Sequence, residues 1–410
     1  MSRKICLLFL FAIVFAAGCS NQTVVAPDAN LNAGAVQVQA KPAVPAVPAV
    51  SDITKNSNKF ALSFYKQLNS QDRKSNLFFS PFSIWTAYAM LYEGADGQTL
   101  QEMKAVFGFN PNIDARRAAM QTELAQYKAS SSSVYGIGIA NSLWVNKGFP
   151  IREYFKYVLG TYYFATATNT VNATQINKWV NNNTFGRIKN LFDSSVNQSQ
   201  LVLVNTIYFK SRWLLEFDKE DTQKDNFFVT KVNPVSVDMM TQTSRFAYYE
   251  NAQVQMLKMK YKDGRPASMI VILPKNYDVN TAWEFLQSAQ DLNSLLEYNQ
   301  VTVTFPKFEI DYAIELKNLI AKLGLTASDF SRISDLSLMI SQAVHKAYIK
   351  VDEKETEAAA ATGIAMVTSA PVFTPPIIFK ADRPFIYLIV DESDGRILFM
   401  GRMMNPAKSN

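Results

Sequence analysis

Residues 76–83 read Asn76-Leu77-Phe78-Phe79-Ser80-Pro81-Phe82-Ser83, an apolar segment that contains its own signal for the start of a helix. A serine side chain can accept a hydrogen bond from a free backbone N–H at a helix start, and proline is favoured in the first turn. Ser80 and Pro81 therefore predict a helix, which the apolar stretch Ser83–Tyr92 continues. A second apolar helical spacing precedes it at Phe60–Leu68.

Segments further along the chain are rich in Val, Ile, Tyr and Phe, which is typical of buried β-strands, and turn residues separate them. The predicted strands are Leu201–Phe209, Ser268–Leu273, Val301–Phe305, Ala347–Val351, Phe385–Val390 and Ile397–Met400. These strands alternate irregularly with helices and lack the regular β-α-β order of a parallel sheet. The sequence therefore predicts an α+β fold with large antiparallel or mixed sheets.

Composition sets limits on the class of protein. The chain has 410 residues, of which 48% are hydrophobic and 12% aromatic, so it can bury a large core. Its formal net charge is +6, and Lys and Arg are scattered along the sequence. A scattered distribution predicts a solvated surface and not a nucleic-acid groove. We therefore expect no nucleic acid among its partners.

The residues able to carry out enzymatic chemistry are few. His345 is the single histidine, so a zinc site with two or three histidines is excluded. A Ser-His-Asp triad would need His345, but the chain has no Gly-x-Ser-x-Gly turn and no Gly-rich phosphate-binding motif. Pairs of Asp and Glu could act in a glycosidase, and a surface scatter explains these pairs equally well. We expect neither an enzyme nor a bound metal or cofactor.

The N-terminus has the pattern of an export signal. Arg3 and Lys4 are followed by an uninterrupted apolar run, Ile5–Ala17, which is too short to span a bilayer. Small residues then precede Cys19, as in the bacterial lipobox, where a signal peptidase cuts before a cysteine that becomes lipidated. This pattern predicts a signal peptide over residues 1–18 and lipidation of Cys19, with plain secretion as the alternative.

A spacer and one large domain follow the signal. Residues 19–50 include the Ala/Pro-rich stretch Lys41–Pro48, which favours an extended, semi-rigid conformation. Residues 51–410 contain no second linker and no repeat, which predicts a single domain held away from its membrane anchor. The predicted location is the envelope of a bacterium, at the outer membrane or cell surface, with release to the extracellular space as the alternative.

Several sequence blocks spread over residues 52–406 form an ordered series. The blocks are Asn76–Ser83, Gly94–Thr99 with Glu102-Met103, Ile176–Val180 with Thr184–Ile188, Val204–Lys210 with Trp213 and Phe217, Phe305–Phe308 with Leu323–Leu325, His345–Ala347, Pro384-Phe385 and Leu398–Arg402. In this order the blocks resemble the serpin family of protease inhibitors. Each block alone is a weak signal, but their shared order makes a chance resemblance negligible.

The resemblance implies a serpin fold with three β-sheets, about eight to nine helices, an exposed reactive-centre loop and a metastable native state. In serpins the central sheet opens to admit a new strand, and small polar groups with one buried histidine control that opening. Buried hydrogen-bonded groups suit this role because they can exchange partners when a third strand arrives. The matching residues are Asn76, Ser80, Ser83, Asn205 and His345, with Trp213 at the point where insertion starts.

The segment after Val351 matches the hinge of the reactive-centre loop. A loop that must become a buried strand needs small side chains, no proline and a period of two residues. Four alanines flanked by glutamates would favour a surface helix on propensity alone, but Thr, Gly and β-branched residues follow at once. In the phase that the resemblance implies, alternate side chains of the inserted strand point inward, namely those of Thr356, Ala358, Ala360 and Thr362. The hinge residues are Glu353, Glu355, Thr356, Glu357, Ala358, Ala359, Ala360, Ala361 and Thr362. The family usually has Gly where Glu355 stands, a difference that could slow insertion.

The resemblance also implies a bond that the protease cuts. Counting from the hinge residue Glu353 places Ser369 before this bond, whereas matching the segment beyond it places Thr368 there. We prefer the bond Thr368–Ser369, with bonds at Val367 and Ala370 as alternatives. The residues around this bond are small or medium and uncharged, which favours elastase-like and subtilisin-like proteases over trypsin-like ones.

The function predicted from the resemblance is therefore suicide-substrate inhibition of serine endopeptidases, with cysteine proteases as a further class. A cut loop inserts into the sheet while the protease is still attached as an acyl-enzyme. The expected partners are the target protease, in a covalent complex, and a membrane through Cys19, and we expect a monomer. The alternatives are a non-inhibitory carrier or storage serpin and a surface lipoprotein that only binds a ligand.

Overall fold

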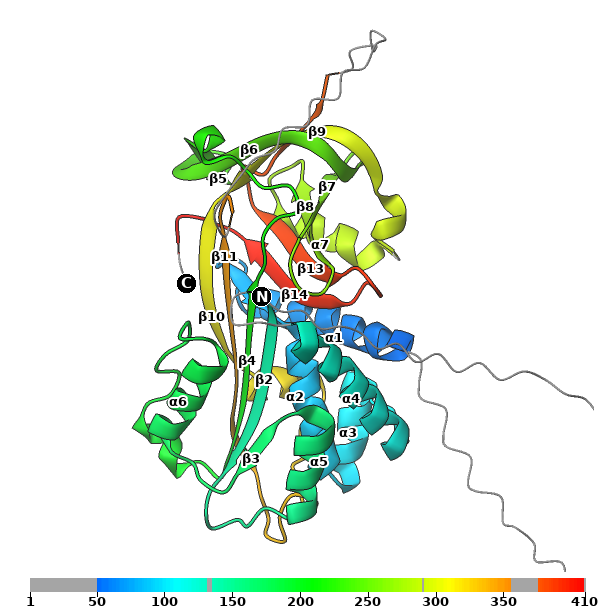
Figure 1. Ribbon diagram of the computed structural model, residues 1–410, viewed down its shortest axis with the longest axis vertical. Coiled ribbons are helices and arrows are strands. Elements are labelled where there is room, and N and C mark those ends of the chain that lie inside the picture. Colours follow the sequence, from blue (N-terminus) through cyan, green and yellow to red (C-terminus); the bar gives the residue numbers. More distant parts are fainter. Residues whose placement is uncertain (1–49, 131–134, 290, 355–374, 409–410) are drawn as a thin grey trace, which may run out of the picture. The chain divides into compact units, whose positions relative to one another are not determined.

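The computed structural model describes residues 50–130, 135–289, 291–354 and 375–408, which all belong to the compact unit Pro45–Asn410 (Figure 1). The predicted signal peptide, Cys19 and the tether up to residue 49 lie outside the described residues, as do loop residues 355–374. Within the described ranges, no helix is long and apolar enough to cross a membrane.

The described ranges contain eight α-helices and fourteen strands. The helices are α1 (Val50–Gln71), α2 (Pro81–Gly94), α3 (Gly97–Phe107), α4 (Ile113–Ser130), α5 (Glu153–Tyr163), α6 (Ala173–Asn183), α7 (Val279–Ser288) and α8 (Lys317–Lys322). The strands are β1 (Leu77–Phe79), β2 (Gly136–Val145), β3 (Thr166–Thr168), β4 (Leu201–Lys210), β5 (Gln223–Thr230), β6 (Asn233–Glu250), β7 (Val254–Lys260), β8 (Ala267–Pro274), β9 (Glu297–Pro306), β10 (Phe308–Glu315), β11 (Ile340–Val351), β12 (Ile377–Lys380), β13 (Phe385–Asp391) and β14 (Ile397–Met403).

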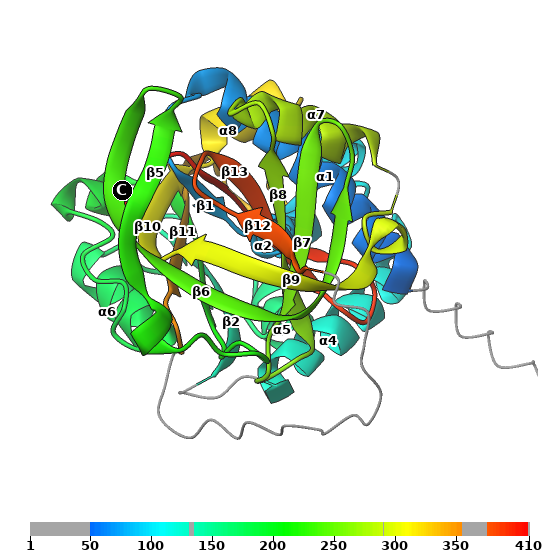
Figure 2. The same cartoon turned by 90° about the horizontal axis from the view of Figure 1, so that it is seen from above.

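The strands form two hydrogen-bonded sheets within the described ranges. A five-stranded sheet has the order β10-β11-β4-β2-β3, and a nine-stranded sheet has the order β1-β14-β13-β8-β7-β6-β9-β12, with β5 beside β6. The resemblance implied three sheets. Two of them are continuous here because the 18-residue strand β6 pairs in turn with three strands: with β5 from Asn233 to Met239, with β9 from Met239 to Tyr248, and with β7 from Ala247 to Glu250 (Figure 2). The predicted α+β fold is confirmed.

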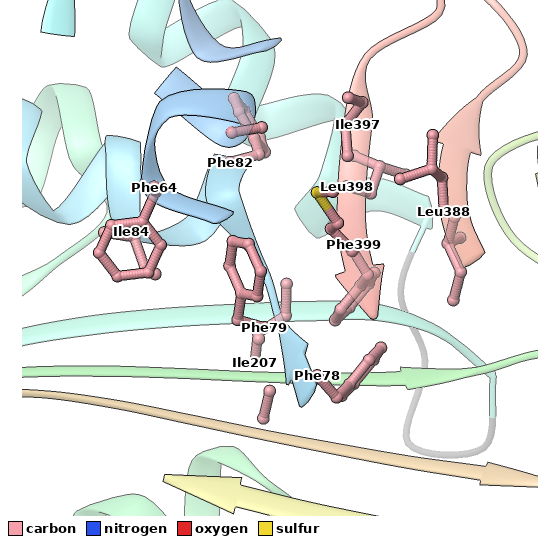
Figure 3. Close-up of a cluster of buried hydrophobic side chains, with 14 of the residues drawn as sticks. Phe64, Phe78, Phe79, Phe82, Ile84, Ile207, Leu388, Ile397, Leu398 and Phe399 are labelled. Carbon is pink, nitrogen blue, oxygen red and sulfur yellow. The ribbon is translucent and has the colours of Figure 1, made fainter. Parts of the chain in front are cut away.

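Helix α2 lies in the main core, which fills the space between the two sheets. Ser80 caps the helix by accepting a hydrogen bond from the Ser83 N–H, and Pro81 occupies its first turn, as the sequence predicts. Every residue of α2 is buried, so the helix has no side that faces solvent. Figure 3 shows α2, β1, β4, β13 and β14 contributing side chains such as Phe82, Ile207 and Phe399 to one apolar cluster.

The five-stranded sheet is covered on both faces. Helices α2 and α4 pack against β4 and β2 on one side (Figure 1). On the other side α6 contributes Ile176 and Val180 to a second apolar cluster with Val202 and Val204 of β4. A sheet that is covered on both faces explains why β4 has apolar residues on both of its faces, with Asn205 and Thr206 as buried polar exceptions.

Most predicted strands are confirmed, with longer boundaries. The predicted strand Ala347–Val351 was too short, because β11 begins at Ile340. Polar residues interrupt the apolar pattern of β11, although this strand lies inside the sheet between β10 and β4. The block Leu398–Arg402 lies within β14, where Gly401 is opposite Tyr387. A Cβ atom at Gly401 would lie 2.2 Å from the Tyr387 ring, so only glycine fits there.

Candidate functional site

Strands β4 and β11 pair directly with each other in the middle of the five-stranded sheet. The pairing is parallel and runs from Ile340 opposite Leu201 to Tyr348 opposite Tyr208. The outer neighbours of this pair, β2 and β10, are both antiparallel. Parallel pairing is slightly less stable per residue than antiparallel pairing. The junction of β4 and β11 is therefore the weaker seam in this part of the sheet.

A buried histidine bridges this seam. His345 Nδ1 lies 2.5 Å from Asn205 Oδ1, and the Ser80 N–H donates a hydrogen bond of 3.1 Å to His345 Nε2. Because Nε2 accepts, the proton of the neutral ring lies on Nδ1 and is donated to Asn205. Burial lowers the pKa of His345 to about 3, so the ring is neutral at ordinary pH.

Asn205 connects the seam to neighbouring elements. Its Nδ2 donates to Asn141 Oδ1 on β2 and to Ser83 Oγ on α2, at 2.5 and 2.6 Å. Ser80 Oγ in turn donates to the Leu398 carbonyl on β14, at 2.6 Å. The network thus joins three strands of one sheet, the start of α2 and a strand of the other sheet. Its members are buried and hydrogen-bonded to one another, so the polar side chains within the seam have partners there.

The two strands separate at the end of the seam that lies next to Trp213. A small cavity of about 10 Å³ lies between the last residues of β4 and β11. Trp213 lines this cavity, stacks on Tyr261 with ring centroids 4.5 Å apart, and donates a hydrogen bond of 3.0 Å to the Asp352 carbonyl. The aromatic pair therefore covers the place where the pairing of β4 with β11 ends.

Glu353 is held firmly just after β11. Its carboxylate forms an ion pair with Lys307 at 2.8 Å and accepts a hydrogen bond from the Thr222 hydroxyl at 2.8 Å. Its carbonyl accepts from the Phe217 N–H at 3.2 Å. Burial alone would raise the pKa of Glu353, but the hydrogen bonds from Lys307 and Thr222 outweigh burial and lower this pKa below its usual range. The hinge therefore begins at a fixed, charged anchor.

The structure brings together most of the matched polar residues. Ser80, Ser83, Asn205 and His345 form the network, and Trp213 lies at the end of the seam. Asn76 lies elsewhere: its Oδ1 accepts hydrogen bonds from the Met404 and Asn405 N–H groups, at 2.8 and 2.9 Å. It precedes β1, and the pairing of β1 with β14 brings it beside the C-terminal segment. The remaining loop residues, Glu355 to Thr362 and Val367, Thr368, Ser369 and Ala370, lie outside the described residues.

Three residues of the site were missed in the sequence. Asn141 is a polar residue within the apolar strand β2, and that interruption was the available signal. Lys307 lies in the block Phe305–Phe308 and Thr222 lies directly before β5, and neither has a local pattern that points to Glu353. Their roles depend on contacts between residues far apart in the chain.

His345 is not placed to act on a substrate. His345 is completely buried and its two ring nitrogens are occupied by Asn205 and the Ser80 backbone, so it can reach no substrate. In the described part of the chain, no group of three or more His, Cys, Asp and Glu residues could hold a metal ion. The site instead joins β4 to β11 across the seam.

Comparison with known proteins shows the family of the chain. Residues 55–406 match the family model described as serpin, serine protease inhibitor. The chain belongs to the serpin family. An uncharacterized serpin-like protein of Thermococcus kodakarensis is 37% identical over 364 residues, which cover 85% of this chain and 84% of that protein. The fold implied by the sequence resemblance is confirmed.

Solved serpin structures match the same fold. Serpin48, described as a highly specific serpin of the insect Tenebrio molitor, is 30% identical with a TM-score of 0.75, and the match covers 86% of this chain and 98% of that one. Human thyroxine-binding globulin, solved in complex with thyroxine, is 27% identical with a TM-score of 0.76, and the match covers 87% of this chain and 99% of that one. The matches therefore include a family model described as serine protease inhibitor and a solved serpin-fold protein with a bound ligand.

Proposed function

We propose that this serpin is an inhibitor that traps its target protease by inserting its cut loop between β4 and β11. The observation that carries this proposal is the direct parallel pairing of β4 with β11 through the His345–Asn205 contact. The hinge begins two residues after β11, at Glu353, so a loop released by cleavage would start beside the end of this seam.

The two ends of the loop are attached to different sheets. β11 belongs to the five-stranded sheet, whereas β12, which begins at Ile377, pairs with β9 at the edge of the nine-stranded sheet. An intact loop is therefore held at both ends. A cut frees the part that follows β11, which can then insert and form backbone hydrogen bonds with both β4 and β11 in place of the single ladder between them.

The covalent step is carried out by the protease. Its nucleophile attacks the carbonyl carbon of Thr368, and the bond to the Ser369 nitrogen breaks with a proton going to that nitrogen, which leaves Thr368 as an acyl group on the protease. Insertion of the hinge then moves the attached protease and distorts its active site before water can release it. The uncharged residues around this bond favour elastase-like and subtilisin-like serine proteases, with cysteine proteases as a further class.

The test is incubation with elastase, followed by a denaturing gel and mass measurement of the released peptide. We expect a covalent complex that survives denaturation and a C-terminal peptide that begins at Ser369. Elastase whose serine has been blocked beforehand should form no such complex. Cleavage without any complex would contradict inhibition, and a peptide that begins before Val367 or after Val372 would contradict the placement of the bond.

A second candidate function is ligand carriage by a non-inhibitory serpin. The similarity to thyroxine-binding globulin, which was solved with thyroxine bound, favours this candidate. The same experiment separates the two functions, because a carrier would be cleaved without forming a covalent complex.

The same proposal includes the location of the protein. Export through residues 1–18 and lipidation of Cys19 would fix the inhibitor to the cell envelope of a bacterium, with the tether as spacer. Labelling with a radioactive fatty acid should mark the wild type and leave Cys19→Ala unlabelled. Equal labelling of both proteins would contradict the lipid anchor.

A further inference from the structure

Four arginines line a cavity that lies outside the network at β4 and β11. The cavity has a volume of about 490 Å³ and lies where the ends of α2, α4 and α5 meet the segment before β11. Arg116 and Arg117 of α4 line it together with Arg152 before α5 and Arg332. A volume of this size is typical of sites for small organic molecules.

The floor of this cavity carries an excess of positive charge. Glu93 at the end of α2 is buried, and its carboxylate pairs with both Arg116 and Arg117 at 2.8 Å. The same carboxylate accepts a hydrogen bond from the Tyr163 hydroxyl at 2.8 Å. One negative charge thus faces two guanidinium groups. In a partly buried site the remaining positive charge attracts an anion more strongly than it would in water.

The rim offers two further guanidinium groups. Arg152 pairs with Asp335, and the two side chains are 48% and 83% exposed. Arg332 pairs with Asp96, and both side chains are nearly half exposed. Ion pairs with this exposure contribute little to stability, so another anion can readily replace the aspartate as the partner of the arginine. Asp114 is the other acid that lines the cavity, and it lies exposed at the start of α4.

One wall of the cavity is apolar. Tyr154 on α5 is 65% exposed, with the Arg117 guanidinium 5.6 Å from its ring centroid, and Ile113 on α4 is also exposed. Phe155 and Val158 continue this surface into the interior. An exposed aromatic ring beside guanidinium groups can hold the apolar body of a ligand whose charged group is bound by the arginines.

We propose that this cavity binds an amphipathic organic anion. A carboxylate, sulfonate or phosphate group would bind between Arg117, Arg152 and Arg332, and an apolar ring or chain would lie against Tyr154 and Ile113. The proposal does not depend on protease inhibition, because none of these residues belongs to the network at β4 and β11.

The test compares two fluorescent probes that differ in one group. 8-Anilinonaphthalene-1-sulfonate carries a sulfonate, and N-phenyl-1-naphthylamine is the same ring system without it. We expect the wild type to bind the sulfonate probe at one saturable site, with a Kd at least about tenfold lower than that of the neutral probe. Equal affinity for both probes, or no saturable binding of the sulfonate probe, would overturn the proposal.

Matched variants locate the site. Arg152→Gln and Arg332→Gln should each raise the Kd of the sulfonate probe about fivefold and leave the neutral probe unaffected. Lys156→Gln is the control, because Lys156 lies on α5 four residues after Arg152, pairs with Glu153 and does not line the cavity. An equal change in the control would show a general charge effect and overturn the site. The wild-type comparison of the two probes stays decisive even if an arginine variant fails to fold.

Discussion

His345 on β11 lies directly opposite Asn205 on β4, and the ring and amide of the two residues are joined across the seam that an inserted strand would have to open. The contact requires the neutral imidazole, because the second ring nitrogen accepts the Ser80 N–H. Protonation of that nitrogen would replace an accepted hydrogen bond by a repulsive contact between two donors. The strength of the seam is thus linked to the protonation state of the single histidine.

We expect the native state to lose stability as the pH falls below about 6.5. An unfolded His345 binds a proton near its ordinary pKa of 6.5, whereas the folded pKa is about 3, so the unfolded state binds more protons between these values. The stabilisation is complete above pH 6.5 and falls by up to about 1.4 kcal/mol per pH unit on acidification. The unfolding midpoint of the wild type and of His345→Gln, measured from pH 7 to pH 4, should differ in slope. Parallel curves would contradict the linkage.

The ion pair between Lys307 and Glu353 should control how tightly the hinge is held. Lys307→Ala removes the cation from the buried Glu353 carboxylate, which keeps its hydrogen bond with the Thr222 hydroxyl. The unfolding midpoint should therefore fall, and the Phe217 amide, which donates to the Glu353 carbonyl, should exchange its hydrogen faster. Lys380→Ala is the control, since its pair with Asp225 is exposed on both sides. If the two variants behave alike, the buried pair has no special role.

Thr356→Arg should turn the inhibitor into a substrate. The inward phase predicted for Thr356 would bury a cation without a partner, which costs of the order of several kcal/mol and slows insertion, while cleavage continues. Glu357→Arg, predicted to face outward, should do much less harm. The measurement is the fraction of covalent complex relative to cleaved protein on a denaturing gel. Equal loss in both variants would show that the predicted phases are wrong.

A cation near the cut bond should change the target class. Val367→Lys or Thr368→Arg would supply the charged side chain that a trypsin-like pocket binds, whereas the wild-type residues are uncharged. We expect the association rate with trypsin to rise by at least tenfold in one of the two variants. If neither variant gains in rate, the residues that determine specificity lie elsewhere in the loop.

Local chemistry made the first part of the fold predictable. Ser80 and Pro81 encode the start of α2 within a few residues, and the structure has the cap that they predict. The start of β11 was less predictable, because Gln342 and His345 interrupt its apolar pattern. Their burial depends on strands β4 and β10, which come from distant parts of the chain.

In the candidate site, too, some residues could be predicted from the sequence and others depend on contacts between distant parts of the chain. The family blocks identified His345 and Asn205, which the structure joins. The contact of Asn205 with Asn141 and that of Glu353 with Lys307 depend on register between strands and on the path of the chain after β11. Asn76 belongs to a matched block, but it precedes β1, and the pairing of that strand places it against the C-terminal segment.

Strands β13 and β14 follow the loop in the chain, yet β13 is buried between β8 and β14 along its whole length. A single cut between residues 355 and 374 would therefore leave two polypeptides held together without a covalent link, the shorter of which supplies two inner strands. Once denaturant separates them, refolding becomes a bimolecular reaction whose yield depends on concentration. A molecule cut once would thus have lost the ability to refold alone, and dilution during refolding would distinguish cut from intact protein.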